Sequence, residues 1–184
     1  MALDTYGGAY NIGIATNGGS VGIGTPNPTS TLDVNGTTTT KVLTITGGSD
    51  IAEPFEVKEE SIEPGFVMCI DPDAPGKLRL SRVEYDTTVA GVVSGAGGVK
   101  AGMTMSQQGE LEGDHPIALA GRVYCWCDAS FGAIRPGDLL TTSPTPGHAM
   151  KVTDHSRANG AILGKAMSSL SEKKGLVLAI VALQ

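Results

Sequence analysis

The chain of 184 residues is 40% hydrophobic and 17% charged, which suits one folded domain with a small appendage. Its net charge is −6 and its largest basic cluster is the pair Lys173 and Lys174, which argues against nucleic acid as a partner, because phosphate binding needs several cations on one face. No apolar run reaches the roughly 18 residues of a membrane helix, so membrane insertion is not expected.

Residues 1–48 form a Gly/Thr-rich segment in which a short motif occurs twice. Residues 11–16 (NIGIAT) are repeated nine residues later as residues 20–25 (SVGIGT), and each copy places two β-branched residues on one face and glycine on the other. Such a ribbon cannot bury its apolar edge alone, and identical chains are the simplest source of neighbouring copies. The alternative interpretation is a disordered Gly/Thr linker.

A further strand is predicted at residues 37–46, at the end of this segment. The residues are mostly β-branched and alternate, with Val42 and Thr44 on one face and Leu43 and Ile45 on the other. The pattern predicts a strand that leads into the next domain.

From residue 49 onward the sequence is denser in apolar residues, and its signals are almost all β. Eight strands are predicted, at residues 66–70, 77–81, 89–94, 117–127, 138–142, 149–153, 161–167 and 176–183. No amphipathic helix of three turns is expected, because Pro54 interrupts the helix formers of residues 50–60. The almost wholly apolar last strand suits burial on both faces, in a barrel core or at a subunit interface.

The same region contains an internal duplication. Each copy reads as a Pro-Gly turn, a strand, a second Pro-Gly turn and a second strand, and the four turn glycines are Gly65, Gly76, Gly137 and Gly147. Pro-Gly favours a type II turn, because proline fixes φ at the second position and glycine supplies the positive φ at the third. The alternative is coincidence among common turn dipeptides.

Three strand-like runs carry a glycine between apolar residues, at Gly91, Gly121 and Gly164. A glycine inside a strand usually marks a bulge or the close approach of another backbone. We therefore predict an all-β fold. Residues 49–184 would form a small, bent, pseudo-twofold β-barrel-like domain, and residues 1–48 a Gly-rich β segment of fibre or shaft type.

Several motifs resemble those of known proteins. Residues 21–26 (VGIGTP) and 32–36 (LDVNG) resemble a signature of tail-fibre and spike proteins of bacteriophages and related bacterial surface proteins, and residues 48–55 (GSDIAEPF) resemble the element that opens their C-terminal domains. The remainder, up to residue 184, is similar to the peptidase G2 or intramolecular-chaperone domain of phage appendage proteins. The matching elements are residues 116–123 (PIALAGRV), 134–143 (IRPGDLLTTS), 145–151 (TPGHAMK) and 160–166 (GAILGKA).

The resemblance implies a trimeric, β-rich fibre or spike component, placed on a virion tail or an extracellular surface. It further implies that the C-terminal domain helps three chains find register, and that some relatives release this domain by self-cleavage. It assigns no catalytic residue to this chain.

The residues themselves offer few candidates for catalysis. Cys125, Cys127 and Ser143 are the potential nucleophiles and His148 is the nearest base in sequence, but no nucleophile-elbow pattern surrounds a serine. The two cysteines are more simply explained as small buried side chains on one face of a strand, with Trp126 on the other face.

Self-cleavage requires only a strained peptide and a nearby carboxylate or amide. Residues 128–130 (DAS), residues 154–156 (DHS) and the labile pair Asn159-Gly160 supply such groups. The simpler interpretation of all three is a solvated loop.

No metal or cofactor is expected, because His115, His148 and His155 are scattered and no CxxC or HxxxH spacing occurs. An acidic cluster is most simply a solvated face, although in a threefold assembly it would recur on every chain and bind a cation or set a pH response. Its members are Glu53, Glu56, Glu59, Glu60 and Glu63.

These observations favour a structural protein, a component of a phage-tail-like fibre or spike whose C-terminal domain promotes homotrimer assembly. Two alternatives stay open. One is an autoproteolytic intramolecular chaperone that cleaves itself once. The other is an adhesin that binds a host receptor or carbohydrate, for which one Trp and four Tyr supply few stacking side chains.

Overall fold

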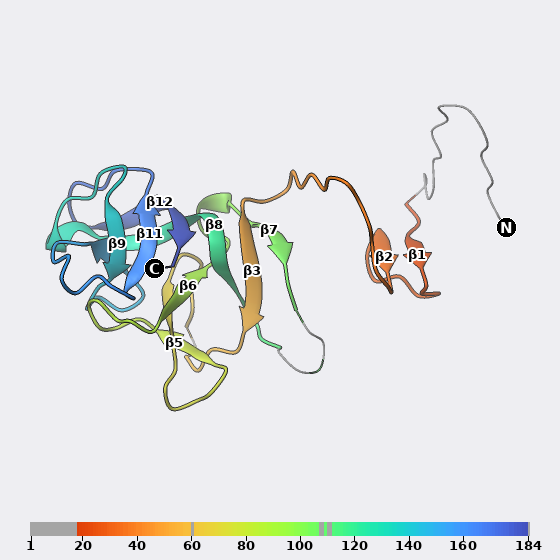
Figure 1. Cartoon of the computed structure of the whole chain (residues 1–184), viewed down its shortest axis with the longest axis horizontal. Coiled ribbons are helices and arrows are strands. Elements are labelled where there is room, and N and C mark those ends of the chain that lie inside the picture. Colours follow the sequence, from red (N-terminus) through yellow and green to blue (C-terminus); the bar gives the residue numbers. More distant parts are fainter. Residues whose placement is uncertain (1–17, 60, 107–108, 110–111, 184) are drawn as a thin grey trace. The chain divides into compact units, whose positions relative to one another are not determined.

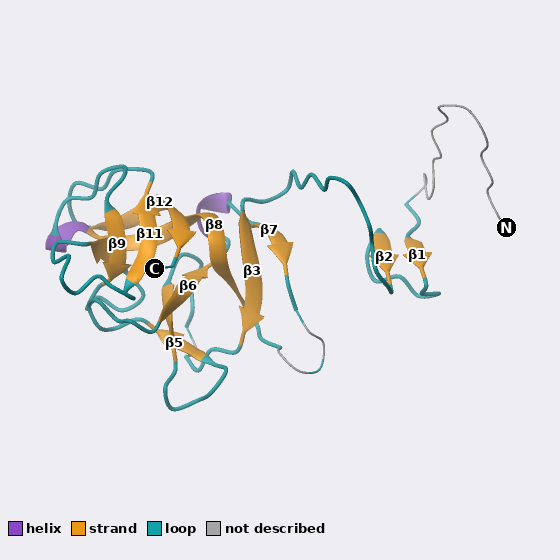
Figure 2. Cartoon of the chain, viewed as in Figure 1, coloured by secondary structure: helices purple, strands orange, loops and turns teal. Residues whose placement is uncertain are grey.

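The computed structural model describes residues 18–59, 61–106, 109 and 112–183, and that part of the chain contains β-strands and two 3-10 helices of three residues each (Figure 2). The all-β prediction is confirmed. The chain divides into two compact units, Met1–Thr44 and Ile45–Gln184, whereas the predicted domain boundary follows residue 48. The first copy of the predicted repeat, at residues 11–16, lies outside the described residues.

The described part of the first unit contains two short strands, β1 (Val21–Ile23) and β2 (Leu32–Val34), which pair in parallel. The helix-free stretch between them, residues 24–31, is shorter than the usual crossover of a dozen or more residues. The Asp33 carboxylate accepts hydrogen bonds from the amide and the hydroxyl of Thr29 within this stretch. The chain thus makes one coil and returns beside itself, as a solenoid repeat does, and such a coil stacks on neighbours.

The prediction of a strand at residues 37–46 is wrong for the single chain. These residues form no β-ladder, and the side chains of residues 37–46 are exposed. Strand propensity reflects the fit of a side chain to a paired, half-buried surface, so it produces a strand only where a partner supplies that surface. Within the described chain no such partner lies beside residues 37–46.

The second unit contains ten strands, which belong to one continuous sheet (Figure 1). They are β3 (Asp50–Phe55), β4 (Val67–Ile70), β5 (Leu78–Leu80), β6 (Val89–Val93), β7 (Ala101–Thr104), β8 (His115–Asp128), β9 (Leu139–Thr142), β10 (Ala149–Lys151), β11 (Ile162–Ala166) and β12 (Lys174–Ala182). The short 3-10 helices are η1 (Ala96–Gly98) and η2 (Ala129–Phe131). All eight predicted strands of this region are present, whereas β3 and β7 were not predicted.

The four Pro-Gly turns have the predicted type II geometry. The glycines Gly65, Gly76, Gly137 and Gly147 have φ values of 93°, 81°, 93° and 70°. In each turn the amide after the glycine donates to the carbonyl before the proline, at 3.0–3.2 Å. The duplicated turns therefore close two equivalent hairpins, β4–β5 and β9–β10.

The duplication extends beyond the hairpins to the strand order. The orders β5-β4-β6 and β10-β9-β11 correspond, and the strands β12 and β8 lie between the two groups. Strands β8, β12, β11, β9 and β10 form a closed barrel, because Ala149 on β10 pairs with Cys127 on β8. Strands β3, β8, β6, β4 and β5 form a second ring, closed by a bridge between Val57 and Leu78. Each hairpin thus occupies its own ring, which differs from the prediction of one barrel built from both.

The two rings share an apolar core. One buried cluster joins Leu140 and Leu163 of the barrel to Val67 and Val92 on β4 and β6 of the other ring. A second cluster, which includes Met68 and Ile117, lies in the ring of β3–β6 and β8. Because β8 contributes residues to both clusters, it couples the two halves of the second unit.

The three strand glycines lie where the strands bend. The pairing register shifts next to Gly91 on β6, near Gly121 on β8 and at Gly164 on β11. A Cβ atom at Gly91 or Gly121 would lie 2.5 Å from a backbone carbonyl oxygen of a neighbouring strand segment, that of Ala118 or Ser49 respectively. The prediction that these glycines mark bulges and close backbone approaches is confirmed.

Candidate functional site

The first unit exposes large apolar side chains. Ile23 and Leu32, which lie on β1 and β2, are 55% and 59% exposed, and Val42 and Leu43 are 77% and 68% exposed. None of the three buried apolar clusters includes a residue from 18–44. Removing such side chains from water contributes about 25 cal/mol per Å² of apolar surface, so this unit gains stability from any apolar surface that covers it.

A row of apolar residues also crosses the outer surface of the second unit. Met103 on β7, Ile51 on β3, Ala120 on β8 and Ala182 on β12 are successive cross-strand partners, so they lie on the same face of the sheet. All four are exposed, Ile51 and Met103 each by 39%. We call these four residues the outer row. The sequence could not reveal it, because the register between four separate strands brings its members together.

Strand β12 adds to the same exposed surface. Val177, Ala179 and Val181 are buried in the barrel, whereas on the opposite face Leu178 is half-buried and Ile180 is 41% exposed. Burial of β12 on both faces within a barrel core is therefore wrong, and its burial at a subunit interface stays a prediction. On this outer face Ile180 and Ala182 are exposed, whereas Leu176 lies beside Gly65.

A hollow of about 440 Å³ lies beside the outer row. Its lining residues are Ile45, Gly48, Ser49, Asp50, Ile51, Gly102, Met103, Ala120, Gly121 and Arg122. Asp50 is only 3% exposed, and neither oxygen of its carboxylate has a hydrogen-bond partner among the described residues. Burial of an unpartnered polar group is unfavourable, and the hollow lies directly beside this carboxylate.

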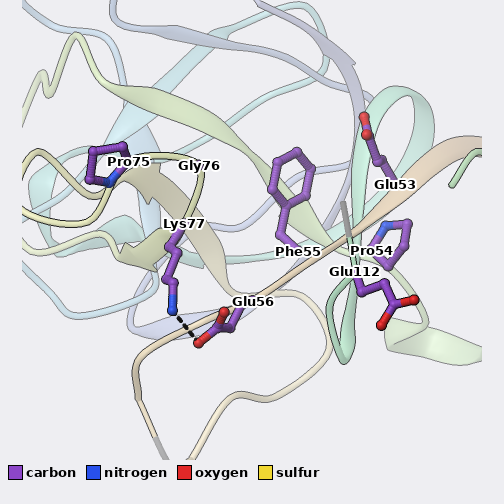
Figure 3. A pocket seen from close by; sticks show the side chains of 8 residues that line it. All are labelled: Glu53, Pro54, Phe55, Glu56, Pro75, Gly76, Lys77 and Glu112. Carbon is purple, nitrogen blue, oxygen red and sulfur yellow. Dashed lines mark hydrogen bonds and ion pairs between the residues drawn. The ribbon is translucent and has the colours of Figure 1, made fainter. Parts of the chain in front are cut away.

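A second pocket, of about 260 Å³, is lined by acidic and apolar side chains (Figure 3). Glu56 forms an ion pair with Lys77, and the carboxylates of Glu53 and Glu112 lie apart from this pair. The apolar part of the wall comes from the rings of Pro54, Phe55 and Pro75. The pocket is an exposed acidic depression at the C-terminal end of β3.

The structure separates the members of the predicted acidic cluster. Glu53 and Glu56 line the pocket, Glu59 accepts a hydrogen bond from the amide of Leu80, and Glu63 is exposed. Glu60 lies outside the described residues. Across residues 18–59, 61–106, 109 and 112–183, no three acidic, His or Cys side chains form a group that could hold a metal ion.

The candidate nucleophiles Cys125 and Cys127 point into the core, opposite the half-buried Trp126. The hydrogen bond to Cys125, together with burial, raises the pKa of the Cys127 thiol well above its usual value. Burial likewise raises the pKa of Cys69 to about 12. The thiolate is the nucleophilic form, so Cys69 and Cys127 are packing residues in this fold.

Ser143 and His148 lie close together, but not as a nucleophile and its base. The Ser143 hydroxyl donates to the backbone carbonyls of His148 and Thr145, at 2.8 and 3.2 Å. The His148 ring directs Nδ1 to the carbonyl of Pro146 at 2.7 Å. Both side chains therefore stabilise the turn between β9 and β10.

The two acidic loops proposed for self-cleavage form local turns. Asp128 accepts hydrogen bonds from the Ser130 amide and the Thr145 hydroxyl, and Asp154 accepts from the amide and the hydroxyl of Ser156. Burial raises the pKa of Asp128, but these hydrogen bonds outweigh it and lower the pKa overall. Hydrogen bonds from Ser156 lower the pKa of Asp154 as well.

The pair Asn159-Gly160 occupies the middle of a turn in which the amide of Ala161 donates to the carbonyl of Ala158 at 2.9 Å. Both residues of the pair are exposed. Within the described part of the chain, none of the candidate residues for catalysis meets a second one in a nucleophile–base arrangement.

No family model matches the chain. No curated protein matches it either. Among the residues that the structure describes, no helix has the length and hydrophobicity needed to cross a bilayer.

Proposed function

We propose that this chain is a structural component of a fibre or spike of the phage-tail type, and that it works as a homotrimer. The proposal places it on a virion tail or an extracellular surface. Its second unit would be the assembly domain, and its first unit would be the start of a shaft.

The observation that carries the proposal is the exposure of the first unit. Four large apolar side chains on residues 18–44 are more than half exposed and belong to no buried cluster, although two of them lie on strands. A repeated β-coil with apolar edges is completed by stacking on like units, and identical chains supply these in register. The sequence resemblance to tail fibres supports three chains as the number.

The test is the mass of the full chain in solution, by size-exclusion chromatography with light scattering at about 10 μM. We expect three times the mass of one chain. A stable monomer of 18.8 kDa at this concentration would refute the proposal.

A matched pair of variants locates the contact. Leu32→Asp places a charge on an exposed apolar position of β2, and we expect it to weaken the trimer at least about tenfold, because burying one leucine stabilises by roughly 1.5–3 kcal/mol. Asn27→Asp places the same charge on an exposed polar position of the same unit and should leave the mass unchanged. Equal effects of the two variants would assign the contact to another surface.

The two alternatives from the sequence, self-cleavage and receptor binding, stay predictions. The mass of the intact chain during long incubation tests the first, since cleavage of one peptide bond yields two fragments. Binding to an array of glycans tests the second.

A further inference from the structure

The edge strand β7 has an open side. In the described part of the chain it pairs with β3 alone, through its register of Asp50 with Ala101 and Ile51 with Met103. Natural edge strands are usually protected by Lys, Pro or a covering loop. Strand β7 reads Ala-Gly-Met-Thr, and its Met103 is 39% exposed, so it carries none of these protecting residues.

The chain also contains a strand-like segment without a partner, at residues 37–44. Lys41 and Leu43 alternate with Val42 and Thr44, so each pair occupies one face of an extended chain. Val42 and Leu43 are the two most exposed large apolar side chains of the described residues. Two incomplete features of opposite kind thus occur in one protein, a free sheet edge and an unpaired strand.

We propose that residues 37–44 of one chain add to the sheet of a second copy, beside β7. This contact rests on the proposed function, because it specifies how the copies in the trimer are joined. Strand addition supplies main-chain hydrogen bonds, and alternate side chains enter pockets of the recipient sheet.

The pocket for such a side chain is present next to β7. The hollow of about 440 Å³ is walled by Met103, Ile51 and Ala120, which are three members of the outer row. Leu43 from the added strand would extend this row by one strand and enter the hollow. The contact covers apolar surface on both copies.

Charge selects the direction of the added strand. On β3, the face that carries Ile51 continues two residues later with Glu53, and on the added segment Leu43 is preceded two residues earlier by Lys41. Neither Lys41 nor Glu53 belongs to an ion pair among the described residues. An antiparallel strand with Leu43 opposite Met103 brings Lys41 toward Glu53, whereas a parallel strand directs Lys41 away from it.

The contact also fits a closed assembly. It joins two different surfaces, the donor segment of one copy and the recipient edge of the next, so each copy donates once and receives once. Such head-to-tail contacts close into a ring when the rotation between copies is one third of a turn. Gly47 in the connection to β3 has no atom within 4 Å of a Cβ built on it, so the chain has steric freedom at this position.

Disulfide trapping between differently tagged full-length chains tests the proposal. One chain carries Leu43→Cys, the other carries Met103→Cys, and the two are produced together in one cell. We expect a disulfide-linked pair that contains both tags, seen on a non-reducing gel. The matched control replaces Leu43→Cys by Val42→Cys, which faces the other side of the strand and should give little of that product.

A second pair of variants tests the direction. If the strand is antiparallel with Leu43 opposite Met103, then Lys41→Cys in one chain should cross-link with Met105→Cys in the other. This pair also keeps the test open if Met103→Cys fails to fold. In chains with the Leu43–Met103 cysteine pair, Lys41→Glu should slow cross-linking roughly threefold at low salt, and Glu53→Lys should restore it.

The outcomes separate this inference from the proposed function. A wild-type trimer in which neither cysteine pair cross-links would refute the strand addition and leave the trimer intact as a conclusion. Equal cross-linking by Val42→Cys would also refute it, because a strand fixes which face meets β7. A wild-type monomer would overturn both proposals together.

Discussion

The two regions of this chain use similar residues with different results. Residues 18–44 and the second unit are both rich in β-branched residues and glycine, yet the first has two strands of three residues and the second has ten strands around buried cores. The second unit contains its sequence pattern twice, and the long strand β8 pairs with β6 of one copy and with β10 of the other. The comparison indicates that β propensity yields structure only where the same chain supplies the partner strand.

The largest expected difference between the regions concerns leucine. Leu140→Ala removes a side chain that is 0% exposed in the barrel, and we expect a loss of about 3 kcal/mol in the free energy of unfolding. Leu43→Ala removes one that is 68% exposed, and in solutions dilute enough to keep the chains apart it should change that free energy by less than about 0.5 kcal/mol.

Urea unfolding followed by tryptophan fluorescence provides the measurement, because the single tryptophan, Trp126, lies on β8 in the second unit. An equal loss in both variants at low concentration would mean that residues 37–44 pack within their own chain. The first unit would then not differ from the second in burying its apolar side chains within one chain.

Two glycines of the second unit allow a comparison between a crowded and an open backbone position. Gly121 has φ +108°, and a Cβ atom there would lie 2.5 Å from the Ser49 oxygen and 2.7 Å from the Asp50 Cα. Gly121→Ala combines backbone strain with a clash against backbone, so we expect a loss of about 3 kcal/mol in the free energy of unfolding.

The matched control for this variant is Gly76, which has φ +81° and no atom within 4 Å of a built Cβ. Gly76→Ala should cost about 1 kcal/mol, from backbone strain alone. If the two substitutions prove equally harmful in urea unfolding, the close approach of β3 to β8 does not constrain the bend in β8.

The sequence was a good guide where local chemistry decides the structure. Pro136-Gly137 specifies its own turn, and Gly164 marks its own bulge, because both depend on the backbone preferences of two or three residues. Strand β7 gave no such signal, since it is short and its pairing with β3 depends on the rest of the sheet. The strand predicted at residues 37–46 is absent for the opposite reason. These residues have a strong local preference for extended structure, but no strand of the described chain pairs with them.

The candidate surface was less predictable than the fold. Ile51 and Ala120 meet only through the register of β3 on β8, and that register includes a shift that no pattern in the sequence announces. The burial of Cys125 and Cys127 could be predicted, because alternation along one strand suffices to place them on one face. The isolation of the Asp50 carboxylate could not, because it depends on every segment that packs around it.

The smallest expected effect compares two aspartates under acid. Asp86 in the second unit is buried, and its carboxylate accepts hydrogen bonds from Thr88 and Arg79. Burial raises the pKa of Asp86, but these partners outweigh it and hold the pKa below the ordinary value of 3.8. Hydrogen bonds from Thr29 to the half-buried Asp33 in the first unit also lower its pKa.

A group with a lowered pKa in the folded state stabilises the fold above its unfolded value and loses that contribution as the pH falls through the folded value. We therefore expect the free energy of unfolding to decline below about pH 4, and Asp86→Asn to flatten the decline by at most about 1.4 kcal/mol per pH unit, the limit for one proton. Asp33→Asn should leave the decline unchanged. Trp126 reports on the unfolding of the second unit, and Asp33 forms none of the hydrogen bonds within that unit. Urea unfolding between pH 2 and 6 measures how the free energy of unfolding depends on pH. An unchanged dependence in Asp86→Asn would assign the acid sensitivity to other carboxylates. A flattened dependence in Asp33→Asn would show that the first unit stabilises the second.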